Sequence, residues 1–146
     1  MKPVLMLTFG IALVSAAGCS DGRPVRVKVS GQVQIDGKPL THGFVQVLPN
    51  NDRAASGKIG TDGRFTLTTY EPNDGCVPGK HRACVVAVEP LGATKQRWHA
   101  PKRYANPESA GLEVDVPKET DALVIKLSWE GGQPFEELFA SEGPTH

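Results

Sequence analysis

The sequence of 146 residues predicts an all-β fold, an antiparallel β-sandwich of about seven strands. Short runs in which apolar and polar residues alternate recur along the chain, as in strands with one buried face. The 16 glycines and 12 prolines supply turns between these runs, and no long segment keeps a helical period. Aromatic residues make up only 6% of the chain. This composition fits short strands and turns better than a helical bundle.

Residues 1–18 have the pattern of an export signal and are left out of the fold prediction. Lys2 precedes an almost wholly apolar run at 4–14, which is too short to span a membrane comfortably. Small residues that a signal peptidase can accept follow at 15–18.

Cys19 directly follows these small residues. The letters AAGC at 16–19 resemble a bacterial lipobox, whose cysteine is alkylated by a diacylglyceryl group, although the commonest lipobox has Leu where Ala16 stands. We predict that Cys19 is lipidated and attaches the protein to a membrane, with residues 19–24 as a lipidated tether. An ordinary secretory signal with an incidental cysteine is the alternative. By resemblance to lipoprotein sorting, Ser20 favours the outer membrane, facing the periplasm or the exterior.

The first strand is predicted within residues 25–40, VRVKVSGQVQIDGKPL. Odd positions from Val25 to Ile35 are apolar or glycine, and even positions are polar, so one face can be buried. Gly37 can take a positive φ and Pro39 cannot continue a ladder, so the chain is expected to reverse there.

Further strands are predicted where β-forming residues lie between turn-rich segments. The turn TDGR at 61–64 predicts a hairpin between the two strands that it joins. The strand at 80–89 is apolar on both faces at its centre, so we expect it in the middle of a sheet. The last two strands are expected to pair with each other. The predicted strands cover residues 43–48, 55–60, 65–69, 80–89, 112–116 and 123–127.

Two segments show no strand pattern. Glycines and prolines interrupt residues 90–111, which are therefore predicted to form a long excursion with at most one helical turn. The tail at 129–146 is expected to hold one short amphipathic turn or to fray. The predicted domain is therefore 25–128.

The charge balance and the missing motifs narrow the class of function. The chain carries 16 basic and 16 acidic residues without a long run of either sign, which argues against a nucleic-acid partner. Its histidines lack zinc-site spacing, and no Cys-x-x-Cys or His-Glu-x-x-His motif is present, so no metal or other cofactor is predicted. No Gly-x-Ser-x-Gly elbow supports a serine triad, so the sequence does not predict an enzyme.

Several turn motifs follow one another in a specific order. They are VSGQV at 29–33, DGKPL at 36–40, TDGRF at 61–65 and PGK at 78–80, before the apolar strand. This order resembles carboxypeptidase regulatory-like domains, which have a transthyretin-like fold. The segments PKRYANP at 101–107 and SAGL at 109–112 are similar to a segment of small bacterial lipoproteins of this kind. The resemblance covers about residues 25–128. Transthyretin-like hydrolases of 5-hydroxyisourate end in Tyr-Arg-Gly-Ser, whereas this chain ends in EGPTH, which disfavours that activity.

Cys76 and Cys84 lie eight positions apart and flank a Pro-Gly turn. In an exported protein they could close a small disulfide loop. The alternative is that they are two separate small residues that fill space in the core.

Residues 95–104, KQRWHAPKRY, form the predicted contact surface. Four cations gather there around two aromatic residues, a combination that suits stacking on sugars, gripping anionic polymers or docking a protein. The alternative is that the aromatic side chains cap an open end of the sandwich while the cations stay solvated. The predicted contact residues are Arg97, Trp98, Lys102, Arg103 and Tyr104.

These patterns favour a non-catalytic, lipid-anchored envelope protein whose β-sandwich binds or scaffolds a partner. That partner is expected to be an envelope protein or a polysaccharide. An accessory carbohydrate-binding module is the alternative, and it requires the aromatic residues of the excursion to lie flat and exposed. A transthyretin-like hydrolase ranks third, because no nucleophile, base or metal set converges in the sequence.

Overall fold

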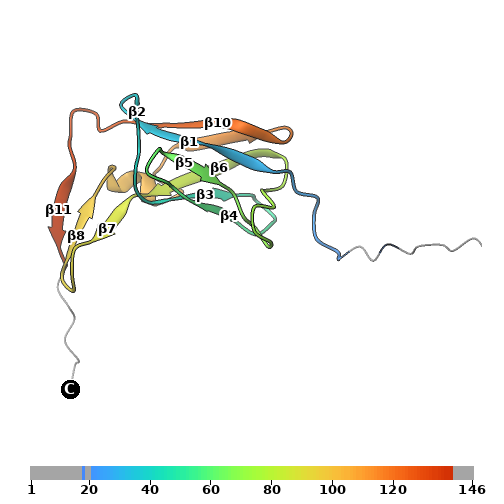
Figure 1. Ribbon diagram of the computed structural model, residues 1–146, viewed down its shortest axis with the longest axis horizontal. Helices are drawn as coiled ribbons and strands as arrows, with labels where there is room; N and C mark the ends of the chain where they lie inside the picture. Colours follow the sequence, from blue (N-terminus) through green and yellow to red (C-terminus); the bar gives the residue numbers. More distant parts are fainter. Residues whose placement is uncertain (1–17, 19–20, 140–146) are drawn as a thin grey trace, which may run out of the picture.

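The computed structural model describes residue 18 and residues 21–139. This part of the chain is nearly all-β, with eleven strands, one 3₁₀ turn and no α-helix. Two four-stranded sheets form a sandwich around one apolar core, and a three-stranded sheet lies at one end (Figure 1). The predicted all-β class is confirmed, while the described part has more strands than the seven expected.

The first sheet is built around β1 (Val29–Ile35). On one edge β1 pairs with β10 (Thr120–Leu127), and on the other edge with β5 (Arg64–Thr66) and β2 (Lys38–Pro39). The β1–β10 pair is parallel, so the prediction of a wholly antiparallel sandwich is wrong for this pair. The two strands are far apart in sequence, and this leaves room for the crossover connection that parallel strands require.

The turn after β1 forms as predicted. Asp36 and Gly37 have φ values of 48° and 79°, and Ile35 pairs with Lys38, so the loop is a two-residue hairpin with positive φ at both positions. The strand begins later than predicted, because Val25 is 80% exposed and precedes β1 by four residues.

The second sheet has the order β4 (Ala55–Lys58), β3 (Phe44–Leu48), β6 (Gly79–Val86) and β9 (Leu112–Val116). All its pairs are antiparallel. β6 lies between β3 and β9, which confirms the prediction of a central strand. The predicted pairing of the last two strands is wrong, because β9 joins β6 while β10 crosses to β1.

The predicted hairpin around the TDGR turn is split between the sheets. β4 pairs with β3 in the second sheet, and β5 pairs with β1 in the first. The two segments hydrogen-bond to each other at an isolated bridge between Ser56 and Thr68 and at the turn, where Gly60 donates to the Arg64 carbonyl at 2.8 Å. The hairpin therefore links the two layers of the sandwich.

The core lies between the facing surfaces of the two sheets. Small and medium apolar side chains dominate it, as expected for a thin sandwich of short strands. Its largest fully buried side chains are Leu67, Val29, Val33, Val45, Val47, Val85, Val116, Cys76 and Cys84.

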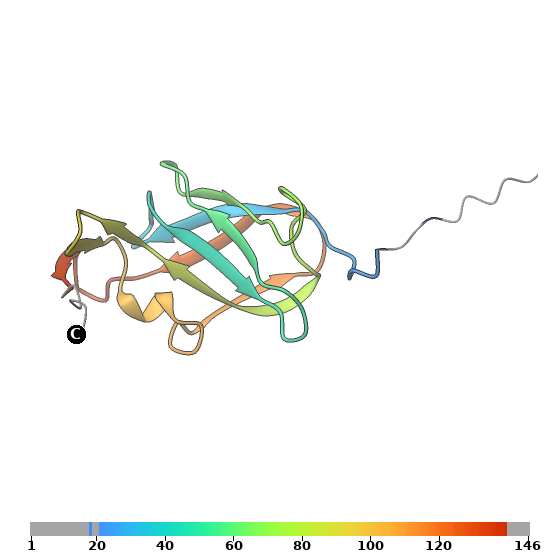
Figure 2. The ribbon, with the colours of Figure 1, turned by 90° about the horizontal axis from the view of Figure 1, so that it is seen from below.

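The third sheet comprises β7 (Val88–Pro90), β8 (Lys95–Trp98) and β11 (Phe135–Leu138), with β8 in the middle. The sequence did not predict β8 or β11, which lie in the segments assigned to the excursion and the tail. A single turn, η1 (Lys102–Ala105), agrees with the expected helical turn and lies against β6 (Figure 2).

The two ends of the molecule differ. The chain enters the sandwich at one end of the long axis, and the three-stranded sheet occupies the opposite end (Figures 1 and 2). Cys19, the predicted lipidation site, lies outside the described residues. Within the described part, no helix is both long and apolar enough to cross a membrane.

Candidate contact surfaces

Two of the five predicted contact residues lie on the three-stranded sheet. Arg97 and Trp98 belong to β8, whose backbone pairs with β7 on one side and β11 on the other. Lys102 belongs to η1 and reaches the same surface, because its Nζ lies 5.5 Å from the centroid of the Trp98 ring. The sheet therefore brings three of the five predicted residues together.

Glu136 of β11 neutralises two cations of β8. It forms ion pairs with Lys95 and with Arg97, whose Nη2 lies 2.5 Å from Oε1. Hydrogen bonds from Lys95 and then from Arg97 lower the pKa of the Glu136 carboxyl. These cations thus contact a neighbouring strand of their own chain.

Glu137 is the acceptor for a second set of donors. Its carboxylate pairs with Lys102 and accepts hydrogen bonds from Trp98 Nε1 at 3.0 Å and Gln96 Nε2 at 3.1 Å. The hydrogen bond from Lys102, followed by those from Trp98 and Gln96, lowers the pKa of Glu137 to about 2. The carboxylate therefore stays ionised over the whole physiological range.

One aromatic side chain, Phe135, packs against Trp98. Its ring stacks on Phe135 with centroids 6.5 Å apart, and Trp129 meets Phe135 edge-on at 6.4 Å. Trp98 is half-buried, whereas Phe135 remains 39% exposed. A sugar therefore does not meet a flat, open Trp98 ring on this sheet.

Tyr104 has a different role from Trp98. It is 4% exposed, and its hydroxyl accepts hydrogen bonds from the Ser128 backbone N–H at 3.1 Å and from Arg103 Nη2 at 2.7 Å. Arg103 also pairs with Glu130 at 2.7 Å. Ser128 directly follows β10, so Tyr104 closes the sandwich at the end of that strand. The capping alternative thus describes Tyr104, and the predicted contact surface is divided.

Sequence reasoning missed the acidic partners of this surface. Glu130, Glu136 and Glu137 lie in the tail, which showed too few alternating residues for a strand prediction. The available signal was complementary charge, since FEEL at 135–138 carries two acids and KQRW at 95–98 carries two bases. Opposite charges at matching positions of two short segments favour cross-strand pairing.

Cys76 and Cys84 are both buried and both free in the structure, as the alternative of two separate residues that fill space in the core describes them. Cys76 lies in a bridge with Val27, before β6 begins. Cys84 lies within β6, where its Sγ donates to Gln46 Oε1 at 3.5 Å. Five residues of extended strand separate the start of β6 from Cys84, a rise of about 16 Å, which carries the second thiol away from the first.

Three arginines surround Tyr70 where the tether enters the sandwich. The guanidinium carbons of Arg23, Arg26 and Arg53 lie 4.7, 4.8 and 5.4 Å from the ring centroid. Arg26 Nε also lies 2.8 Å from Asp74 Oδ2. The alternating pattern places Arg26 on the polar face of the first strand, where it was expected to be solvated. In the structure its side chain packs against Tyr70 and Asp74. These contacts attach the start of the chain to the body of the domain.

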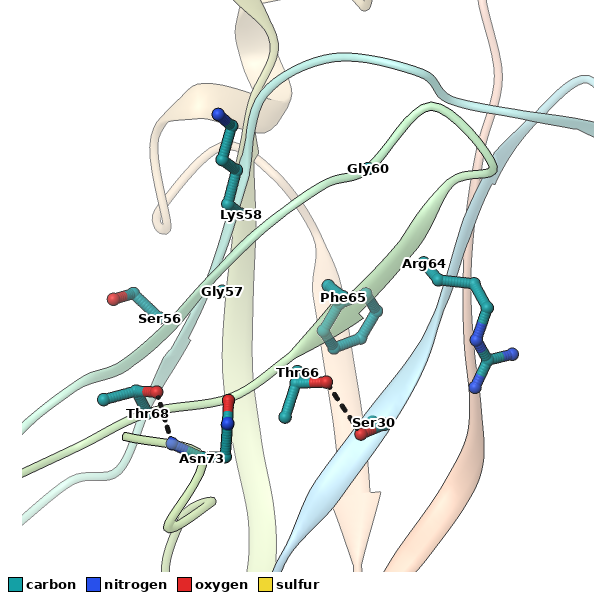
Figure 3. Close-up of a pocket in the computed structure, with 10 residues that line it drawn as sticks. All are labelled: Ser30, Ser56, Gly57, Lys58, Gly60, Arg64, Phe65, Thr66, Thr68 and Asn73. Carbon is teal, nitrogen blue, oxygen red and sulfur yellow. Dashed lines mark hydrogen bonds between the residues drawn. The ribbon is translucent and has the colours of Figure 1, made fainter. Parts of the chain in front are cut away.

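A groove of about 520 Å³ lies beside β4 and β5. Four of its ten lining residues carry hydroxyl groups, and two hydrogen bonds fix some of them: Ser30 with Thr66 at 3.0 Å, and the Asn73 N–H with Thr68 Oγ1 at 2.9 Å (Figure 3). The lining residues are Ser30, Ser56, Gly57, Lys58, Gly60, Arg64, Phe65, Thr66, Thr68 and Asn73. No sequence pattern predicted this groove, because most of its residues come from two strands that were expected to pair with each other.

Acidic and histidine side chains meet at one further place. His99 Nε2 lies 2.8 Å from Glu89 Oε2, and the ring of His42 lies 5.1 Å from that of His99. Within residues 18 and 21–139, no group of three or more His, Cys, Asp or Glu side chains is arranged to hold a metal ion.

Comparison with known proteins returned no family model that matches the chain, and no curated protein or solved structure that matches it.

Proposed function

We propose that this protein is a non-catalytic, lipid-anchored protein of the cell envelope, whose β-sandwich binds or scaffolds a partner. The observation that carries the proposal is the separation of the two ends. The described chain enters the sandwich at one end of the long axis, a few residues after the predicted lipid attachment, and β8, which carries Arg97 and Trp98, lies at the opposite end (Figure 1). A domain tethered in this way presents Arg97, Trp98 and Lys102 away from its attachment point.

The finer fold assignment is part of this proposal. We propose that the sandwich is a transthyretin-like, carboxypeptidase regulatory-like domain, on the strength of its turn motifs and two-sheet architecture. The acyl chains on Cys19 hold the protein in the outer membrane, facing the periplasm or the exterior. The partner is an envelope protein or a polysaccharide, with no nucleic acid involved.

The first test concerns attachment. Metabolic labelling with a palmitate analogue, followed by membrane fractionation, should find the label and the protein together in the membrane fraction. Cys19→Ser should abolish labelling and release the protein, whereas the neighbouring Ser20→Ala should keep both. An unlabelled native protein would overturn lipid anchoring.

The second test concerns the partner. Crosslinking in intact cells followed by affinity purification should recover one dominant envelope component with the native protein. Trp98→Ala removes the ring beside Lys102, so it should reduce this recovery without lowering the melting temperature. If Trp98→Ala unfolds the protein, the ring is a packing element and the proposed contact surface is wrong.

An accessory carbohydrate-binding module is the second candidate. The groove at β4 and β5 favours it, because hydroxyl groups and two cations line an open cavity at the surface. The aromatic residues of the excursion do not favour it, since Phe135 and Lys102 cover Trp98.

A further inference from the structure

The groove lies at the hairpin around the TDGR turn, whose two strands, β4 and β5, belong to different sheets. Lys58 pairs with Phe44 in the second sheet, while Thr66 pairs with Ser30 in the first. The two strands are joined on either side of this point, by the Ser56–Thr68 bridge and by the turn. Between these contacts Gly57 of β4 faces the Thr66 carbonyl of β5, and Figure 3 shows side chains from both strands around this point.

The shape of the groove depends on a residue without a side chain. A Cβ atom added at Gly57 would lie 2.6 Å from the Thr66 carbonyl oxygen, which is too close for any real contact. Glycine therefore allows β4 and β5 to approach closely beside the opening. The buried Phe65, 3% exposed, supplies apolar surface among the lining residues.

The charged side chains that line the groove are all positive. Two of its ten residues are cations, Lys58 and Arg64, and none carries a carboxylate. Among the described residues, neither cation forms an ion pair, although Arg64 donates to the Asp121 carbonyl at 2.9 Å. The carboxylate of Asp62, at the turn, accepts from the Arg64 backbone N–H at 3.0 Å. These cations differ from those of β8, which face glutamates.

An exposed aromatic ring lies beside the groove. Phe44 is the cross-strand partner of Lys58 on the outer face of the second sheet, and it is 52% exposed. Neighbouring positions of paired strands on one face lie about 5 Å apart at Cβ. Phe44 thus offers an exposed apolar face next to Lys58, one of the cations that line the groove.

We propose that this groove binds an anionic polysaccharide. Sugar hydroxyls exchange hydrogen bonds with Ser56, Thr66 and Thr68, while the acidic groups of the polymer meet Lys58 and Arg64. Phe44 packs against the face of a sugar ring. The inference rests on the second candidate function, carbohydrate binding at this groove, and names the class of its ligand.

An acidic peptide fits the groove less well. A peptide that adds to a sheet needs a free strand edge. The backbone N–H groups of Ser56 and Thr68 are already bonded to each other's carbonyls at 2.9 Å, and Leu67 N–H donates to Val29. Side-chain hydroxyls therefore provide most of the recognition, and these suit sugars.

Titration calorimetry on the mature, unlipidated Cys19→Ser protein tests the proposal. Dextran sulfate and polygalacturonate should bind, unsubstituted dextran should bind much more weakly, and polyglutamate should not compete. Raising the salt concentration to about 0.5 M should weaken binding, because exposed charges are screened. Failure of both anionic glycans to bind, or equal binding of dextran, would overturn the proposal.

Variants locate the site. Lys58→Gln and Arg64→Gln should each weaken binding about fivefold, as expected for an exposed charge pair. Phe44→Ala should weaken it about tenfold if the ring is a main contact. The matched controls are Lys80→Gln, an exposed cation on β6, and Phe139→Ala, an exposed ring far from the groove in sequence. Equal loss in the controls means non-specific charge attraction and contradicts the site.

The result is independent of membrane attachment, because the protein is unlipidated in solution. Loss of glycan binding by the groove variants therefore says nothing of Cys19, and a failed labelling experiment leaves the glycan site standing.

Discussion

A single carboxylate organises the loop beside the tether. Asp74 Oδ1 accepts from the Thr69 N–H at 2.7 Å, and Oδ2 accepts from the N–H groups of Tyr70 and Glu71, each at 3.1 Å. Burial is the largest influence on the Asp74 pKa and raises it, but the three backbone donors and Arg26 together lower the pKa below the ordinary value of 3.8. The loop thus favours the charged form.

Asp74→Ala should therefore lower the free energy of unfolding by about 3 kcal/mol, because three backbone donors lose a charged acceptor. Urea denaturation at neutral pH measures this change. Since the folded pKa is lowered, the contribution of Asp74 is present above pH 3.8 and is lost as the pH falls through the folded pKa. The difference between native and variant protein should accordingly shrink in acid. A constant difference down to pH 2 would contradict this account.

The two buried thiols should be unreactive in the folded protein. Burial raises the pKa of the Cys76 thiol to about 11 and also raises that of Cys84. At pH 8 only about one Cys76 in a thousand is then a thiolate, the form that reacts.

Ellman titration of the Cys19→Ser protein should therefore find no fast-reacting thiol before denaturation and two thiols after it. A protein that shows no thiol after denaturation without reductant contains the disulfide, which would contradict two free buried cysteines.

At the scale of elements, the three-stranded sheet depends on charge more than the sandwich does. Phe135 and Leu138 of β11 are 39% and 76% exposed, so this strand buries little apolar surface. Its backbone ladder to β8 and the ion pairs of Glu136 and Glu137 hold it in place. Such a strand is expected to open locally before the molecule unfolds.

Acid should therefore release β11 first. The Glu137 pKa is about 4.5 when unfolded and about 2 when folded, so its stabilising effect is complete above pH 4.5 and declines between those values. Hydrogen exchange at about pH 3 should show faster opening of β11 amides, after correction for intrinsic rates, with unchanged protection in β6.

Glu137→Gln should produce the same loss of protection at neutral pH, because the neutral amide forms no ion pair with Lys102. Glu113→Gln on β9 is the matched control, since Glu113 is an exposed acid on a strand of the main sandwich. If β11 exchanges equally in all three proteins, the ion pairs do not hold the strand.

The whole molecule has one core, and its stability should depend on that core. Leu67 is fully buried between the sheets and Leu138 is 76% exposed on β11, so the two form a matched pair. Leu67→Ala should lower the free energy of unfolding by about 3 kcal/mol, whereas Leu138→Ala should change it by less than about 0.5 kcal/mol.

Urea unfolding monitored by circular dichroism and by tryptophan fluorescence measures both variants. The two probes should give one coincident transition if the sandwich unfolds as a unit, apart from early changes at Trp98 and Trp129. Similar losses in the two variants would mean that β11 belongs to the main cooperative core.

Local signals predicted much of the sandwich. The alternation in residues 29–35, the Asp36-Gly37 turn and the apolar run of β6 each depend on near neighbours in sequence, and all three appear in the structure. β8 and β11 could not be found in this way, because each is only four residues long and partly or largely exposed. Their pairing depends on charges about 40 positions apart, such as Arg97 and Glu136.

The sequence by itself determined the all-β class, most strand positions and the central place of β6, because period and turn chemistry are local properties. Only the tertiary structure decided that β10 lies parallel to β1, that β4 and β5 belong to different sheets, and that the two buried cysteines lie apart. Pairing partners are chosen by burial of both sheet faces together, a property of the whole chain. The groove beside Lys58 results from the pairing of β4 and β5 with different sheets, so no local sequence pattern could predict it.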